Sequence, residues 1–143
     1  MKPLFFLLLY LIVAQLFSQT KSIVEAYNLR YLDSTASFHR QFEILATQSS
    51  PDEKIISNSF LILSYLKFKD AQRAYQYLRA NEGLNYKQAG DEAKSYYYYA
   101  RYRYKLYIDE PFQEDLLSSF RLFEKNKNYE FATYAATALS YQS

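Results

Sequence analysis

The 143-residue chain contains no cysteine, and it has only two glycines, three prolines and one histidine. Without cysteine, the chain can form no disulfides, no thiol-based active site and no thiolate metal site. The shortage of glycine and proline, beside abundant leucine, alanine, tyrosine, lysine and glutamate, favours helices throughout. The length leaves room for one domain at most. We therefore expect an all-α protein that is held together by its core alone.

The N-terminus carries an apolar run that is too short to span a membrane. Lys2 supplies one positive charge, residues 4–14 are all apolar, and small or polar residues follow. This order is typical of a secretory signal peptide, and we expect residues 1–18 to be removed. A helix over residues 4–17 would cover about 21 Å, whereas a bilayer core needs about 30 Å. An uncleaved anchor is the alternative. We expect export to the periplasm or secretion, with membrane contact only during export.

The charge of the mature chain gives no reason to expect nucleic acid as a partner. Loss of Lys2 from the 17 basic residues leaves 16 Lys and Arg against 15 Asp and Glu, so the net charge is near zero. Nucleic-acid-binding domains are usually basic. Export argues against such a partner independently.

A strong helix start signal follows an N-terminal helical segment expected over residues 22–48. Ser50 can cap a helix, Pro51 suits the first helical position, and Glu53 can complete a capping box. The helix that begins here is expected to run to about residue 68.

Similar signals divide the rest of the chain. Asp70 is expected to cap a return helix, which Gly83 ends as a left-handed residue. Asp91 is expected to cap a helix that runs to about residue 108, and Pro111 to open the next one. A turn at residues 126–128 precedes a last helix. The starts near 51, 91 and 129 are about 38 to 40 residues apart, which indicates a helical-pair solenoid over residues 51–143.

The segment 65–78, YLKFKDAQRAYQYL, resembles a tetratricopeptide repeat (TPR). The family's aromatic residue near the end of the first helix falls on Tyr65, and its small and large apolar residues in the second helix fall on Ala74 and Leu78. Lys69 replaces the family's turn glycine, and Arg103 stands where an aromatic is expected in the second repeat. The resemblance covers about residues 52–143. It implies a short stack of antiparallel helical hairpins, a TPR-like α-solenoid; a generic helical bundle is the alternative. The positions expected to pack one helix closely on another are Tyr65, Ala74, Leu78, Ala100 and Ala132.

The resemblance also implies a non-enzymatic module that binds a protein or peptide segment. Similar arrays with such an export signal form the N-terminal sensory part of signalling proteins of the histidine kinase or transcriptional regulator type. A truncated sensory ectodomain is therefore the alternative function. The last helix is apolar on several sides, so self-association through the segment from Tyr129 to Ser143 is a further expectation.

The densest functional candidate is the stretch 94–105, KSYYYYARYRYK. On a helix, one side of this stretch and the residues after it carries Tyr96, Tyr99, Ala100, Arg103, Leu106 and Tyr107. A basic stripe on another flank consists of Lys94, Arg101 and Lys105. In TPR proteins this helix lines the concave groove, and a groove of this composition would hold an acidic peptide tail or another anion. The alternative is that the tyrosines are core residues and the cations a solvated face. The expected groove residues are Lys94, Tyr97, Arg101, Tyr104 and Lys105.

We expect no catalytic residues, no metal and no cofactor. His39 is the single histidine, so a common zinc site cannot be built. Paired carboxylates such as Asp52 and Glu53 fall in first helical turns, where they complement the helix dipole. No phosphate loop, calcium loop or nucleotide-binding fingerprint occurs.

Overall fold

The structure is a computed structural model, and it describes residues 50–142 together with His39, Arg40, Phe42, Glu43 and Thr47. Within residues 50–142 the regular structure consists of five α-helices and one 3-10 turn, with no strand. The expected all-α class is therefore confirmed. The expected signal peptide (1–18) and most of the expected N-terminal segment (22–48) lie outside the described residues.

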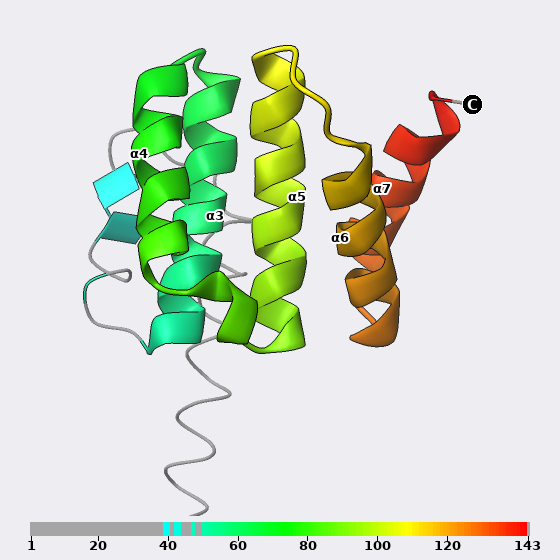
Figure 1. Ribbon diagram of the computed structural model, residues 1–143, viewed down its shortest axis with the longest axis horizontal. Coiled ribbons are helices and arrows are strands. Elements are labelled where there is room, and N and C mark those ends of the chain that lie inside the picture. The colour runs from blue at the N-terminus through cyan, green and yellow to red at the C-terminus, as the bar shows by residue number, and fades with distance from the viewer. Residues whose placement is uncertain (1–38, 41, 44–46, 48–49, 143) are drawn as a thin grey trace, which may run out of the picture. The chain divides into compact units, whose positions relative to one another are not determined.

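The helices form two consecutive hairpins and one further helix (Figure 1). Helix α3 (Pro51–Lys67) pairs with α4 (Ala71–Gly83), and a short 3-10 turn, η2 (Tyr86–Gln88), leads into the second pair. That pair consists of α5 (Asp91–Tyr107) and α6 (Gln113–Lys125). Helix α7 (Tyr129–Ser140) follows and packs on α6, while α3 also packs on α5.

Two of the predicted caps form where the sequence indicated them, and a third cap lies in the predicted turn before α7. Ser50 and Glu53 make a complete capping box, in which each backbone N–H donates to the other's side chain. Asp70 accepts a hydrogen bond from the Arg73 N–H at 3.0 Å. Asn128 caps α7 in the same way. These caps satisfy backbone donors that would otherwise lack partners at the helix starts.

Three of the predicted helix ends are wrong in detail. Gly83 is the last residue of α4, but the left-handed residue is Asn85, with a φ of 53°. Gly90, not Asp91, precedes α5 as the N-cap, because Asp52 accepts its N–H at 3.0 Å and the Asp91 carboxylate instead pairs with Lys125.

Helix α6 begins at Gln113 rather than at Pro111. The turn that closes α5 accounts for the shift. Asp109 adopts a left-handed conformation and the N–H of Glu110 donates back to the Lys105 carbonyl at 2.8 Å, so these residues are committed to ending the preceding helix.

The same closing turn recurs after α3, α5 and α6 without any glycine. Its left-handed residues are Lys69, Asp109 and Lys127, with φ values of 60°, 60° and 57°. Lys69, which the sequence analysis expected to replace a turn glycine, has the left-handed conformation that glycine adopts readily. In this turn the Lys105 carbonyl takes the place that the Tyr65 carbonyl takes after α3. The expected match of Arg103 to a TPR aromatic position stays a prediction. The defining N–H to carbonyl bonds join Asp70 to Tyr65, Glu110 to Lys105 and Asn128 to Phe123.

An aromatic core joins the alternate helices α3, α5 and α7. The ring of Phe60 on α3 lies 5.0 Å from that of Tyr96 on α5 and 6.2 Å from that of Phe131 on α7. Phe42 and Phe123 contact the same cluster. Because rings from several helices meet edge to face, the core sets how the hairpins stack. The five expected packing positions, Tyr65, Ala74, Leu78, Ala100 and Ala132, are all buried.

Helix α7 is covered on one side only. Phe131, Ala132 and Ala135 are buried, whereas Tyr134 is 47 % exposed and Tyr141 86 % exposed. The open side therefore carries large aromatic side chains beside the C-terminal half of α5.

Candidate binding site

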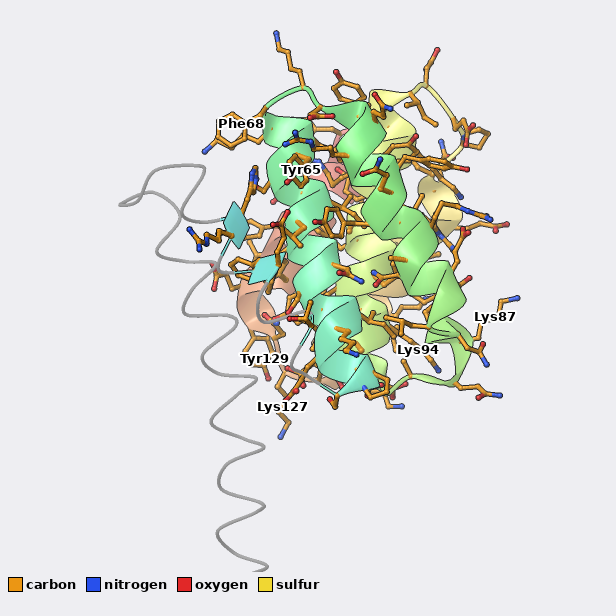
Figure 2. The ribbon with its side chains drawn as sticks, turned by 90° about the vertical axis from the view of Figure 1, so that its left-hand side faces the viewer. Tyr65, Phe68, Lys87, Lys94, Lys127 and Tyr129 are labelled. Atoms are coloured by element: carbon orange, nitrogen blue, oxygen red, sulfur yellow. The ribbon has the colours of Figure 1, made fainter. Side chains whose placement is uncertain are left out.

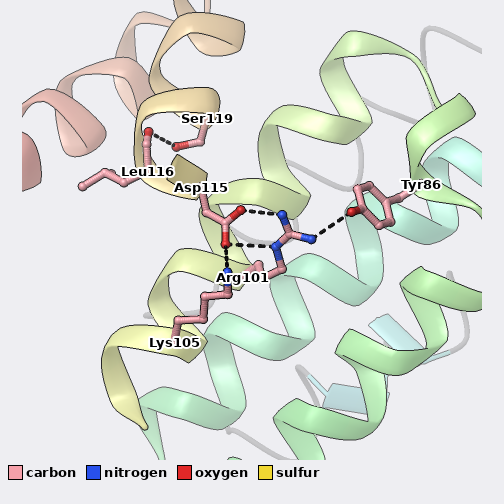
Figure 3. A network of polar contacts seen from close by, with 6 residues as sticks. All are labelled: Tyr86, Arg101, Lys105, Asp115, Leu116 and Ser119. Atoms are coloured by element: carbon pink, nitrogen blue, oxygen red, sulfur yellow. Dashed lines mark hydrogen bonds and ion pairs between the residues drawn. The ribbon is translucent and has the colours of Figure 1, made fainter. Parts of the chain in front are cut away.

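Arg101 is held in a network of polar contacts between α5, α6 and η2 (Figure 3). Its Nε donates to Asp115 Oδ2 at 3.0 Å, its Nη2 donates to Asp115 Oδ1, and its Nη1 donates to the Tyr86 hydroxyl at 2.9 Å. Lys105 Nζ also pairs with Asp115 Oδ2, at 2.8 Å. We call Tyr86, Arg101, Lys105 and Asp115 the Arg101 clasp. It joins the second hairpin to the turn that precedes it.

Asp115 is the buried member of the clasp, and Arg101 is half-buried among aromatic rings. The Asp115 side chain is 4 % exposed and that of Arg101 is 19 % exposed. The Arg101 guanidinium carbon lies 5.2–5.3 Å from the ring centres of Tyr86, Tyr97 and Tyr98. Burial by itself lowers the pKa of Arg101, but the hydrogen bonds with Asp115 and Tyr86 outweigh it and raise the pKa overall. The guanidinium therefore stays charged, with its counter-charge supplied from α6.

The five predicted groove residues do not share one environment. Arg101 and Lys105 both face Asp115, and Tyr97 is fully buried beside Arg101. Tyr104 stacks on Tyr75 of α4, with ring centres 5.9 Å apart. Lys94 lies in the first turn of α5. Figure 2 shows it at the opposite end of the helices from Phe68, the residue that follows α3. The predicted anion site stays a prediction, and an anion at Arg101 would have to compete with Asp115.

Tyr97 carries an unusual hydroxyl group. Its oxygen is buried and has no hydrogen-bond partner among the described residues. Burial raises the pKa of Tyr97, since the charged phenolate would be poorly solvated there. The Tyr97 side chain therefore stays uncharged where it packs against Arg101.

A separate cleft of about 480 Å³ opens between the C-terminal half of α5 and α7. The C-terminal ends of these two helices lie at the same end of the fold in Figure 1. We call this hollow the α5–α7 cleft. Its walls are mostly aromatic or aliphatic and include Tyr99, Tyr102, Leu106, Phe112, Tyr134 and Tyr141.

The walls of the cleft are held in place by ring contacts. Tyr102 lies 5.4 Å from both Tyr99 and Phe112, measured between ring centres. Phe131, buried under the cleft, contacts Tyr99 at 5.6 Å and Tyr134 at 5.6 Å. The cleft is thus lined by side chains that the core already positions, as is usual for preformed binding sites.

Of the described residues that line the α5–α7 cleft, only Arg103 is charged. It is exposed, and no ion pair joins it to another described residue. Burial raises the pKa of Tyr102, and the positive charge of Arg103 opposes that rise, so the two side chains lie close enough to interact. As far as the structure describes its lining, the cleft therefore combines apolar walls with one positive charge and no negative charge.

The described residues offer little for catalysis. His39 Nε2 and Ser64 Oγ are 2.7 Å apart, but Ser64 is only 7 % exposed and lies inside α3. The backbone amides around it are committed to helical hydrogen bonds, so they cannot form an oxyanion hole. No group of acidic or histidine side chains suited to a metal ion occurs in the described part of the chain. No helix there is long and apolar enough to cross a membrane.

Sequence reasoning did not single out the α5–α7 cleft, although two signals for it were present. Arg103 shares a helical side with Tyr99 and Leu106, which is an unusual place for a lone charge. The last helix is apolar on several sides. The sequence did not indicate that α7 lies next to the side of α5 that carries Arg103.

Comparison with known proteins gives no match, whether with protein families, with curated proteins or with solved structures. Functional conclusions therefore rest on the geometry of the chain itself.

Proposed function

We propose that this protein is an exported, non-enzymatic binding module built as a short TPR-like stack, and that it holds a peptide segment of a partner protein in the α5–α7 cleft. The observation that carries the proposal is the cleft itself, which is preformed, aromatic and open. Tyrosine-rich surfaces of this kind bind well because the side chains bury a large area with little loss of conformational freedom.

The regular spacing of the helices supports the TPR-like part of the proposal. Helices α3 and α5 have 17 residues each and begin 40 residues apart, at Pro51 and Asp91. Helices α4 and α6 have 13 residues each. Together with the recurrent closing turn, these equal lengths indicate a repeated hairpin. In TPR proteins the first helices of successive pairs line the binding groove, and here α5 and α7 hold those places.

The size of the cleft favours side chains of an extended peptide over a whole helix. A helix is about 10 Å wide and rises about 5.4 Å per turn, so a single turn occupies roughly 400–500 Å³. A volume of about 480 Å³ thus accepts about one helical turn, or two to three side chains of an extended segment.

Export is tested by expressing the full chain in a bacterium and measuring the mass of the protein outside the cytoplasm. We expect a mature chain that begins at Gln19. An intact chain retained in the cytoplasm would contradict the export part of the proposal.

Peptide binding is tested by selecting peptides from a random displayed library on the mature chain. Two exposed tyrosines of α7 provide a matched pair, since Tyr134 lines the cleft and Tyr129, at 69 % exposure, does not. We expect Tyr134→Ala to weaken the selected peptides about tenfold and Tyr129→Ala to leave them unchanged, measured by calorimetry. Equal effects of the two variants would show that the peptides bind elsewhere.

A further inference from the structure

We infer that the α5–α7 cleft takes an acidic peptide segment, in which a large apolar side chain enters the cleft and a neighbouring Asp or Glu carboxylate pairs with Arg103. This inference rests on the proposed function, because it names the chemistry of the segment that the same cleft would hold.

The first argument is charge complementarity. Among the described residues of the lining, Arg103 is the one charged side chain, and none of them carries a carboxylate to neutralise it. Two residues earlier on the same helix, Arg101 already has its carboxylate in Asp115. A guanidinium presents a planar set of donors that fits a carboxylate with two parallel hydrogen bonds. Arg103 can therefore bind a carboxylate of the incoming peptide, whereas Arg101 already binds a carboxylate of its own chain.

The second argument is the position of that charge beside apolar walls. Tyr102 is 5 % exposed and contacts Phe112, while Leu106, one turn after Arg103, is 47 % exposed. An apolar side chain can therefore bury itself against these rings while an adjacent carboxylate remains at the exposed Arg103. Partial exclusion of water by the apolar side chain would strengthen the ion pair beyond that of a fully solvated one.

The same lining disfavours other classes of occupant. A basic segment would place its charge against Arg103 with no acidic group in the lining to receive it. A purely apolar segment would cover Arg103 without pairing it, which costs desolvation energy. The acidic segment is the one that satisfies both parts of the lining.

Three short probes test the inference on the mature full-length chain. They are N-acetylated, C-amidated tripeptides in which two phenylalanines flank aspartate, asparagine or lysine. Binding is followed from the backbone amide signals of residues 99–106 and 134–142 during titration to millimolar concentration. We expect the aspartate probe to bind about threefold to tenfold more tightly than the asparagine probe, as a partly exposed charge-assisted hydrogen bond predicts.

Arg103→Gln should remove the preference for aspartate over asparagine. Arg121→Gln is the matched control, because Arg121 is an exposed arginine on α6 that does not line the cleft. Both variants lose one positive charge, so only a local contact distinguishes them. Arg103→Glu should reverse the preference, so that the lysine probe becomes the tightest of the three.

The outcomes separate the inference from the proposed function. If all three probes shift the cleft signals equally, the cleft binds peptides but the carboxylate contact is wrong. If no probe shifts these signals, the proposed function at this cleft fails as well. Equal effects of Arg121→Gln and Arg103→Gln would overturn the inference, because the charge would then act at long range. A dimer that depends on Tyr134 and that no probe dissociates would show that a second copy of the chain occupies the cleft, which would also overturn it.

Discussion

Arg101 and Arg103 lie two residues apart on α5 and have opposite surroundings. Arg101 is 19 % exposed, forms two hydrogen bonds to Asp115 and one to Tyr86, and lies among three tyrosine rings. Arg103 is exposed, lies at an apolar cleft and pairs with no carboxylate among the described residues. The two side chains leave the helix about 200° apart, so they reach different neighbours.

The comparison teaches that composition alone does not distinguish a structural arginine from one available to a ligand. Both arginines belong to the same run of tyrosines and cations. The two arginines differ in whether a carboxylate from another helix balances the positive charge of the guanidinium. Asp115 of α6 does so for Arg101, and this leaves Arg103 as the cation that an outside group can pair with.

The substitution with the largest expected effect on stability removes the carboxylate of the Arg101 clasp. Asp115→Asn should lower the free energy of unfolding by about 3 kcal/mol, because it leaves a buried guanidinium without its counter-charge. Urea denaturation followed by circular dichroism measures this loss. The neighbouring Glu114 is exposed, so Glu114→Gln serves as the control and should change stability by less than about 0.5 kcal/mol. If the two variants are equally stable, the clasp does not stabilise the fold.

The direct form of the comparison substitutes each arginine in turn. Arg101→Gln should cost about 2 kcal/mol, since it removes the hydrogen bonds to Asp115 and Tyr86 and the cation–π contacts. Arg103→Gln should change stability by less than about 0.5 kcal/mol. The same denaturation experiment measures both. A large loss in Arg103→Gln would mean that Arg103 also has a structural partner and is not free to bind.

A third test concerns Tyr97, the buried tyrosine whose ring packs against Arg101. Tyr97→Phe should stabilise the protein by about 1 kcal/mol, because it removes a buried hydroxyl that has no hydrogen-bond partner among the described residues. Tyr141→Phe, at the exposed rim of the cleft, should have no measurable effect. Thermal unfolding of the two variants in parallel distinguishes them. Destabilisation by Tyr97→Phe would show that this hydroxyl makes a bond that the clasp needs.

The smallest expected effect is a change of stability with pH that does not involve Arg101 or Arg103. Guanidinium groups in general stay charged over the pH range of stability measurements, so the pH response comes from other groups. Burial lowers the pKa of His39 from 6.5, and the charge of Glu43 only partly offsets this. Between the two pKa values the unfolded chain binds more protons, so stability should fall slightly as pH falls below about 6.5 and then level off.

The pH effect is checked by comparing urea midpoints at pH 7 and pH 5 in the wild type and in His39→Gln. Burial raises the pKa of Glu92, which acts with the opposite sign, and the variant controls for it because Glu92 is unchanged. The decrease attributable to His39 is the difference between the two chains. An identical pH response in both would show that folding does not lower the pKa of His39.

Much of the local structure could be predicted from single residues. The capping box at Ser50, the cap at Asp70 and the turn before α7 depend on neighbours three or four positions away, so the printed order of residues is enough. One of the errors came where a distant residue intervened. Gly90 replaces Asp91 as the cap because Asp52, 38 positions earlier, accepts its N–H.

The candidate site shows the same division. Helical periodicity correctly separated Arg101 from Arg103 on α5, but the expected groove residues were taken from the side on which Asp115 lies. Asp115 lies in the first turn of α6. Its pairing with Arg101 depends on how α6 packs on α5, which periodicity within one helix does not determine.

By itself, the sequence determined that the chain is helical, where its helices begin and end to within a few residues, and that one helix carries a dense run of tyrosines and cations. These properties follow from short-range propensity, capping and the scarcity of glycine and proline. Only the tertiary structure decided which of those cations already has a partner and which faces an open cleft. The physical reason is that charge pairing and cavity formation depend on side chains brought together by the packing of separate helices, here α6 and α7 against α5.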